Sequence, residues 1–325
     1  MRKNINAEHI EGRLYSLGEA NGRNMLEIKV TGEQSKNPGT TYIAGTVQVA
    51  VDEDGLNVIP VHFTYVTETT KNGGKNGTFA ALKKIIEEGS TWVDHGKDAA
   101  TKVKIDTALA LNEFYLDDAT RGEVLISTKT NEGGFLSIVN ELCPEVERNT
   151  FKMDMVITNV THVEADEEKK IAADYTSVNG AVFNFRNELL PVEFLVKNAA
   201  GMSYFESLGV TNAEPIYTKV WGRINCETKI SESVEESAFG EAAVRTYERK
   251  TREWVITGTA KEPYEFGDEN VMTVDELITA SQNRQVYLAD IKKKAEEWKA
   301  NKATPTATPA TATAPIKPKA GGFSF

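Results

Sequence analysis

Apolar and polar residues alternate along most of the chain up to residue 265, which is the pattern of β-strands that bury one face. Three runs show it clearly, from Tyr42 to Val51, from Leu56 to Val66 and from Lys102 to Leu111. Turn-forming residues separate the runs, such as Asn21-Gly22 and the acidic turn that starts at Asp52. The N-terminal part of the chain is therefore predicted to form a β-meander.

Helical patterns occur at three places, two between strands and one after the last strand. One helix is predicted from Thr78 to Glu88, with Thr78 as its N-cap and Gly89 as its end. A short helix is predicted from Ser203 to Leu208, where Ser203-x-x-Glu206 fits a capping box. A second capping box, Thr273-x-x-Glu276, opens a predicted helix of about 28 residues.

Two stretches share a signature, and the second begins 131 residues after the first. They are Ile59-Pro60-Val61-His62-Phe63 and Leu190-Pro191-Val192-Glu193-Phe194, followed by the same tripeptide at Thr101-Lys102-Val103 and at Thr218-Lys219-Val220. A helix is predicted between signature and tripeptide in both copies. This order indicates one supersecondary unit used twice. Strict alternation puts Val61, Phe63 and Tyr65 on one face, and the Val and Phe positions suit a barrel core.

The repeat divides the chain into two β-rich units. Strands of the second unit are predicted at residues 151–163, 171–175, 181–185, 189–196, 218–228 and 247–259. We predict a first barrel in residues 1–128, a second in 129–268, an amphipathic helix in 269–300 and a disordered tail in 301–325. The boundary between the barrels is approximate, because residues 117–143 lack linker composition. The Ala, Thr, Pro and Lys of the tail cannot bury enough apolar surface to offset the entropy of ordering.

Composition limits the function classes. The apolar fraction of 40% and the charged fraction of 26% suit a soluble globular protein, and no run reaches the roughly 18 apolar residues of a membrane span. The first residues lack the apolar region of a secretory signal. The expected location is the cytoplasm, which is the host cytoplasm if a phage encodes the chain.

The sequence offers little for catalysis. The two cysteines, Cys143 and Cys226, and the four scattered histidines argue against a zinc site and a His-based triad. Phosphate-binding loops and nucleophile elbows are missing too. The pairs Asp52/Asp54 and Asp117/Asp118 would suit a Mg²⁺-dependent nuclease, but both are typical of turns. We expect no enzymatic activity, no metal and no cofactor.

A net charge of −11 opposes a nucleic-acid partner, because phosphate contacts need local positive potential. Much of the acid is concentrated in two stretches, Glu164 to Glu168 and Glu232 to Glu241. These can lie away from a basic groove, so the charge does not exclude nucleic acid.

The order of elements in each unit, with a helix before the fourth strand, resembles the OB fold, a five-stranded Greek-key barrel. The resemblance covers about residues 10–265 and implies a mainly β fold with short helices: two tandem OB-fold-like barrels, a C-terminal helix and a disordered tail. With its aromatic tip, the chain resembles phage-type single-stranded DNA-binding proteins. The resemblance implies that it coats and protects single-stranded DNA during phage replication or recombination. The alternative is a two-domain phage structural or host-factor-interaction protein that binds no nucleic acid.

Aromatic side chains that stack on bases, interleaved with Lys and Arg that contact phosphates, are what single-strand binding requires. The candidate nucleic-acid-binding residues are Lys36, Tyr42, Tyr65, Lys71, Lys75, Trp92, Phe185, Arg186, Lys219, Trp221, Arg223, Arg245, Tyr247, Arg249, Lys250, Arg252 and Trp254. Several have structural alternatives. Residues 245–254 equally suit a solvated edge strand, Trp221 and Phe185 suit a core, and the loop with Lys71 and Lys75 suits a mobile connection.

The chain ends in Phe323-Ser324-Phe325 after a polar tail, which resembles a tethered peptide ligand. In bacterial and phage single-strand binders such tips recruit replication and recombination proteins, so Phe323 and Phe325 are candidate partner-binding residues. Those tips are typically acidic, whereas Lys317 and Lys319 precede this one. A partner pocket would therefore have to differ.

Overall fold

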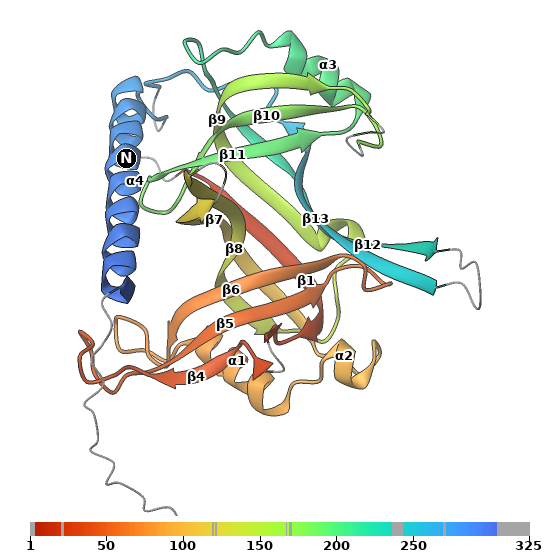
Figure 1. Cartoon of the computed structure of the whole chain (residues 1–325), viewed down its shortest axis with the longest axis vertical. Helices are drawn as coiled ribbons and strands as arrows, with labels where there is room; N and C mark the ends of the chain where they lie inside the picture. The colour runs from red at the N-terminus through yellow and green to blue at the C-terminus, as the bar shows by residue number, and fades with distance from the viewer. Residues whose placement is uncertain are drawn as a thin grey trace, which may run out of the picture.

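The computed structural model describes residues 4–20, 23–118, 120, 122–166, 168, 171–235, 243–268 and 271–303. In this part of the chain, eleven strands belong to one continuous sheet that curls into two rings (Figure 1). Ten of them make up the rings, and β4 (Glu27–Val30) pairs with one side of the first ring. A separate small ladder joins β2 (Glu19–Ala20) and β3 (Arg23–Asn24).

The first ring consists of β1 (Asn6–Ser16), β5 (Thr41–Ala50), β6 (Val58–Thr67), β7 (Lys102–Asp118) and β8 (Gly122–Ile138). Its ladders run β1–β5–β6–β8–β7 and return from β7 to β1, so the ring is closed. The β6–β8 ladder is parallel, and the others are antiparallel. The helices α1 (Gly77–Glu88) and α2 (Trp92–His95) lie between β6 and β7 in the chain.

The second ring consists of β9 (Asn149–Val163), β10 (Tyr175–Phe183), β11 (Leu189–Val196), β12 (Ile216–Glu235) and β13 (Ala243–Thr259). Its ladders run β9–β10–β11–β13–β12 and return to β9, and again the contact of the third strand with the fifth is parallel. The helix α3 (Ala199–Ser207) lies between the third and fourth strands. A short 3₁₀ turn, η1 (Glu145–Glu147), precedes this ring.

Both rings thus have the same strand order and the same helix position, which are those of the OB fold. The predicted mainly β fold with OB-like barrels is confirmed. The repeated signature lies in the third strand of each ring, β6 and β11, and the repeated tripeptide lies at or near the start of the fourth.

One hydrophobic core runs through both rings. The signature residues Val61, Phe63, Val192 and Phe194 are buried in it, as the sequence predicts. The strand β1 pairs with β7 in the first ring and also with β9 in the second, so the ladders continue from one ring to the other.

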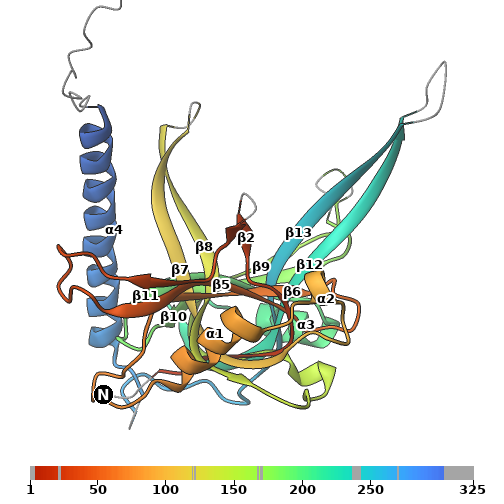
Figure 2. The same ribbon diagram turned by 90° about the horizontal axis from the view of Figure 1, so that it is seen from below.

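The hairpins β7–β8 and β12–β13 extend beyond the barrels that they help to close. Figure 2 shows them diverging on the same side of the molecule. The base of each hairpin lies against the other ring. The backbone N–H of Thr228 in β12 donates to the carbonyl of Leu56 before β6, and the Lys129 ammonium of β8 donates to the carbonyl of Glu193 in β11. The two rings therefore support one another through their hairpins.

The strand β8 is absent from the sequence-based prediction, and its position moves the domain boundary. The boundary drawn at residue 128 falls inside β8, which belongs to the first ring as far as Ile138. Most side chains of β8 are exposed or half-buried, because the hairpin leaves the barrel. Such a strand gives no period-two signal. In the second unit, the strand predicted at residues 171–175 is wrong except at Tyr175, where β10 begins.

Two predicted helix caps are also wrong. Asn76, not Thr78, caps α1, since its side chain accepts from the Thr78 N–H, while the Thr78 hydroxyl turns inward to the Gly134 carbonyl. Asn198 caps α3, and Glu206 instead accepts hydrogen bonds from Thr176 and lies 2.9 Å from the His162 imidazole.

The C-terminal helix, α4 (Val274–Ala303), begins at the predicted capping box. The Thr273 N–H donates to the Glu276 carboxylate at 2.9 Å, and the Glu276 N–H donates to the Thr273 hydroxyl at 3.2 Å. The helix lies beside the β7–β8 hairpin (Figures 1 and 2). Its Arg284 pairs with the buried Glu113 side chain of β7. Residues 301–303 belong to α4, and the remainder of the predicted tail lies outside the described residues. No described helix is long and apolar enough to cross a membrane.

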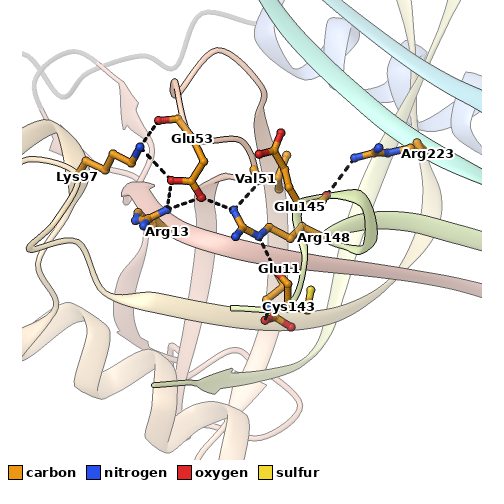
Figure 3. A network of polar contacts seen from close by, with 9 residues as sticks. All are labelled: Glu11, Arg13, Val51, Glu53, Lys97, Cys143, Glu145, Arg148 and Arg223. Atoms are coloured by element: carbon orange, nitrogen blue, oxygen red, sulfur yellow. Dashed lines mark hydrogen bonds and ion pairs between the residues drawn. The ribbon is translucent and has the colours of Figure 1, made fainter. Parts of the chain in front are cut away.

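A network of charged groups fixes the segment that connects the rings (Figure 3). The Glu53 carboxylate accepts from Arg148 at 2.8 Å, from Arg13 at 3.1 Å and pairs with Lys97 at 2.9 Å. Hydrogen bonds from Arg148 and Lys97 lower the pKa of Glu53 to about 2. Because this pKa lies below the ordinary 4.5, the contribution of Glu53 to stability is complete above about pH 4.5 and is lost as the pH falls towards 2.

Candidate nucleic-acid interface

A cleft of about 440 Å³ lies between the outer face of β5–β6 and the β12–β13 hairpin of the second ring. The first ring contributes Thr46 and His62, and the hairpin contributes Lys250 and Arg252. Oligonucleotides bind OB folds on this face of the second and third strands. No described residue that lines the cleft is acidic. It is therefore locally cationic in a chain whose net charge is −11.

His62 forms part of the floor of this cleft. Its Nδ1 lies 2.9 Å from the Thr46 hydroxyl. Burial, together with the nearby Arg252 guanidinium, lowers the pKa of His62 below its ordinary value. The imidazole is therefore neutral at pH 7, so it supplies a hydrogen-bonding group and a flat ring, and the positive charge comes from Lys250 and Arg252.

A bulge in β6 places an aromatic pair on the same outer face. Between Phe63 and Val66 the strand β6 advances by three residues while β5 advances by two, so alternation reverses and Tyr65 faces outward. Its ring centroid is 4.6 Å from that of Tyr42, and 47% of Tyr65 is exposed. Lys29 of β4 lies opposite Tyr42 in the ladder. Tyr42 itself is half-buried. Accessible rings beside a cation are what base stacking requires.

The lysines predicted in loops lie at this aromatic end of the face. Lys36 is exposed between β4 and β5, and Lys71 and Lys75 are exposed between β6 and α1. Because Tyr42 is paired with Thr67, both loops leave the sheet at the same end. Cationic and aromatic side chains therefore lie along the outer face of β5–β6, from the cleft to the end of the face where Tyr42 pairs with Thr67.

A close backbone crossing shapes one wall of the cleft. A Cβ added at Gly45 in β5 would lie 1.9 Å from the Met25 carbonyl oxygen, and Gly45 has a φ of 141°. Only glycine therefore lets the segment before β4 cross here and bring Met25 to the cleft.

A second cleft, of about 460 Å³, lies on the equivalent face of the second ring, between β10–β11 and the β7–β8 hairpin. Lys129 is its cation, and burial lowers the pKa of this lysine. The variable position of the repeated signature distinguishes the clefts, since it is His62 in the first and Glu193 in the second. A carboxylate repels phosphate, so the first cleft is the better site for a polyanion.

The model of the YorF family matches residues 22–294. The chain belongs to the YorF family. No curated protein resembles this YorF chain closely enough in sequence to count as a match. Among solved structures, the wild-type single-stranded DNA binding protein from Thermus aquaticus has a TM-score of 0.45 at 10% identity, covering 82% of the YorF chain and 96% of its own. A deletion mutant of that protein has a TM-score of 0.43 at 10% identity, covering 82% and 98%. Similarity at this level does not indicate what the YorF chain binds.

Trp254 is wrong as a stacking residue. Its side chain has no exposed surface, and its indole N–H donates to Glu8 in the core of the YorF chain at 2.9 Å. Arg252 and Lys250 follow on the same hairpin and do line the first cleft. The same side of β13 faces the core at Trp254 and the cleft at Arg252, because the hairpin leaves its own barrel between these positions.

The predicted alternation of β12 is confirmed, with Val220 buried and Trp221 40% exposed. The cations beside Trp221 have intramolecular contacts. The Arg223 guanidinium donates to the Asn149 side chain at 2.7 Å, and the Lys219 ammonium lies 5.8 Å from the Tyr264 ring centroid. These three residues are not among those that line the two clefts.

Three other candidates lie away from the cleft floor. Trp92 is half-buried in α2, with its ring centroid 6.1 Å from that of Tyr15 and with Lys97 above it, so it supports the rim of the first cleft. Phe185 is 74% exposed at the β10–β11 turn, where Arg186 covers its ring beside α4.

Five candidates lie wholly or partly outside the described part of the chain. Arg245, Tyr247 and Arg249 lie in the distal part of β13, opposite Ser233, Ser231 and Lys229 of β12, but their side chains are outside the described part of the chain. Phe323 and Phe325 are outside it altogether.

Sequence reasoning missed three residues of the clefts, Tyr15, His62 and Lys129. A signal existed for His62, which occupies the variable position between the two conserved apolar residues of the repeat. Tyr15 and Lys129 carried no signal, because they reach the clefts only through the packing of one ring on the other.

Proposed function

We propose that this YorF-family protein binds single-stranded DNA along the outer face of β5–β6. The observation that carries the proposal is the cleft on that face, where the second ring supplies Lys250 and Arg252 and none of the described lining residues is acidic. Phosphates would contact these cations, and bases would stack on Tyr42 and Tyr65. Neither contact reads a base edge, so binding should depend strongly on salt and little on sequence.

The test is a fluorescence anisotropy titration of labelled oligo-dT with wild type and with the double variant Lys250→Gln/Arg252→Gln, over a series of salt concentrations. Each phosphate contact to a single strand contributes about 0.7 to the slope of log K against log salt. Loss of two contacts should lower the slope by about 1.4 and weaken binding roughly tenfold at low salt. Glutamine keeps a donor for the contact of Arg252 with the Lys129 carbonyl.

Two matched variants identify the cause of any loss. Lys83→Gln/Lys84→Gln removes two exposed cations from α1, away from the cleft, and should leave affinity and slope unchanged. Tyr42→Leu/Tyr65→Leu should weaken binding by a similar factor with the slope preserved, because stacking releases no counterions. Absence of binding by wild type at low salt would refute the function and favour the alternative of a structural or host-interaction protein.

We also propose that the protein coats single-stranded DNA in phage replication or recombination and that Phe323 and Phe325 recruit partner proteins. The support is the sequence of the tail. Deleting residues 304–325 leaves α4 complete and should leave oligo-dT affinity unchanged within about twofold, which is below 0.5 kcal/mol. The truncated protein should lose its association with replication proteins in a pull-down from infected cells. Undiminished association would contradict the role of the tip.

A further inference from the structure

A histidine, a carboxylate and a thiol meet outside the clefts, where the segment connecting the two rings crosses β1. His9 and Glu11 are alternate residues of β1, and Cys143 belongs to the connecting segment. One ligand atom from each lies within 4.8 Å of the other two. Figure 3 shows Glu11 beside Cys143. These residue types are zinc ligands in proteins.

Neighbouring groups orient two of the three ligands. His9 Nδ1 lies 3.3 Å from the Asp106 carboxylate, which turns Nε2 towards the Glu11 carboxylate, also 3.3 Å away. The Cys143 N–H donates to the other Glu11 oxygen at 2.6 Å. A carboxylate on the far nitrogen of a ligating histidine is the common second contact of zinc sites.

The separations suit a tetrahedral ion. Two ligands about 2.0–2.1 Å from Zn²⁺ lie roughly 3.3–3.4 Å apart, which matches the distance from His9 Nε2 to Glu11 Oε2. A thiolate about 2.3 Å from the ion would lie about 3.5 Å from each of them. The present limit of 4.8 Å means that the Cys143 sulfur needs to move by little more than 1 Å.

We propose that His9 Nε2, Glu11 Oε2 and Cys143 Sγ bind Zn²⁺, with a water molecule in the fourth position. The ion would lie between His9 Nε2 and Glu11 Oε2, which are 3.3 Å apart, and would bind a lone pair of each. Binding releases the thiol proton to solvent.

The proposed ion would fasten the connecting segment to β1. The Cys143 carbonyl already accepts from Arg148 Nε at 2.8 Å, and Arg148 pairs with Glu53, so the ion would add a second attachment to the same segment. The sequence predicts no zinc site because 134 positions separate His9 from Cys143, a distance that only the fold closes.

The test is zinc binding by the full chain. After equilibration with Zn²⁺ and dialysis, elemental mass spectrometry should find about one zinc per wild-type chain. Co²⁺ should give a thiolate-to-cobalt charge-transfer band. Cys143→Ser and His9→Gln should each lose the retained zinc, and Cys143→Ser should also lose the band. Asp106→Asn should weaken affinity at least about tenfold while keeping the band, because it acts through His9.

Cys226→Ser is the matched control, since this second cysteine is buried in β12 and belongs to the first cleft. It should keep both the zinc and the cobalt band. Zinc retention that is equal in wild type and Cys143→Ser, or absent from wild type, would overturn the site. Each protein's circular dichroism spectrum establishes that it is folded. None of these results depends on DNA binding.

Discussion

Replacing Glu8 with glutamine should stabilise the protein by about 3 kcal/mol at pH 8 and by almost nothing at pH 4. Glu8 lies in the shared core, where its carboxylate accepts from the Trp254 indole N–H and the Thr107 hydroxyl. Burial raises the pKa of Glu8 from 4.5 to about 7 in spite of these two hydrogen bonds. A neutral amide keeps both partners and avoids a buried charge.

The sign follows from proton linkage. The folded protein holds the Glu8 proton up to about pH 7, and the unfolded chain releases it near pH 4.5. Between these values the folded state binds more protons, so the free energy of unfolding of wild type falls as the pH rises. Above about pH 7 both states are ionised and the full cost of the buried charge remains.

Urea denaturation of wild type and Glu8→Gln at pH 4, 6 and 8 measures the effect. Other titrating groups, such as Glu53, are common to both proteins and cancel in the difference at each pH. Glu88→Gln, on the exposed surface of α1, is the control and should change stability by less than about 0.5 kcal/mol at every pH. A difference between wild type and Glu8→Gln that is the same at every pH would contradict the assignment.

The sequence predicted those strands that keep one face in a barrel core. The runs at β6 and β11 alternate because alternate residues are buried, and the signature marks the third strand in both rings. It did not predict β8 or the length of the hairpins. Most side chains of β8 lie outside any core, so its sequence does not alternate between apolar and polar residues.

The candidate site was predictable only in parts. Tyr42, Tyr65, Lys250 and Arg252 were found as residue types, but their common face was not, since a bulge reverses Tyr65 and the packing of one ring on the other brings Arg252 to β6. The common face could not be predicted because its residues come from different rings and are far apart in the sequence. Contacts between rings depend on the β1–β9 ladder, and no local pattern encodes that pairing.

Trp254→Leu should destabilise the protein by about 3–5 kcal/mol, whereas Trp221→Leu should cost less than about 1 kcal/mol. The two residues look alike in sequence, each on a strand beside basic residues. Trp254 has no exposed surface and fills the core between the rings, while Trp221 is 40% exposed. Urea denaturation at pH 7 compares the two, and equal losses would contradict the burial that separates them.

The milder change Trp254→Phe tests the contact with Glu8 directly. It removes the indole N–H and leaves Glu8 Oε1 without its donor, which costs more when the carboxylate is charged. When Glu8 is present, Trp254→Phe should therefore lower the free energy of unfolding by about 1 kcal/mol more at pH 8 than at pH 5. In the Glu8→Gln background the loss should be the same at both pH values, because the amide does not ionise. A pH-dependent loss in that background would mean that another group, not Glu8, titrates beside Trp254.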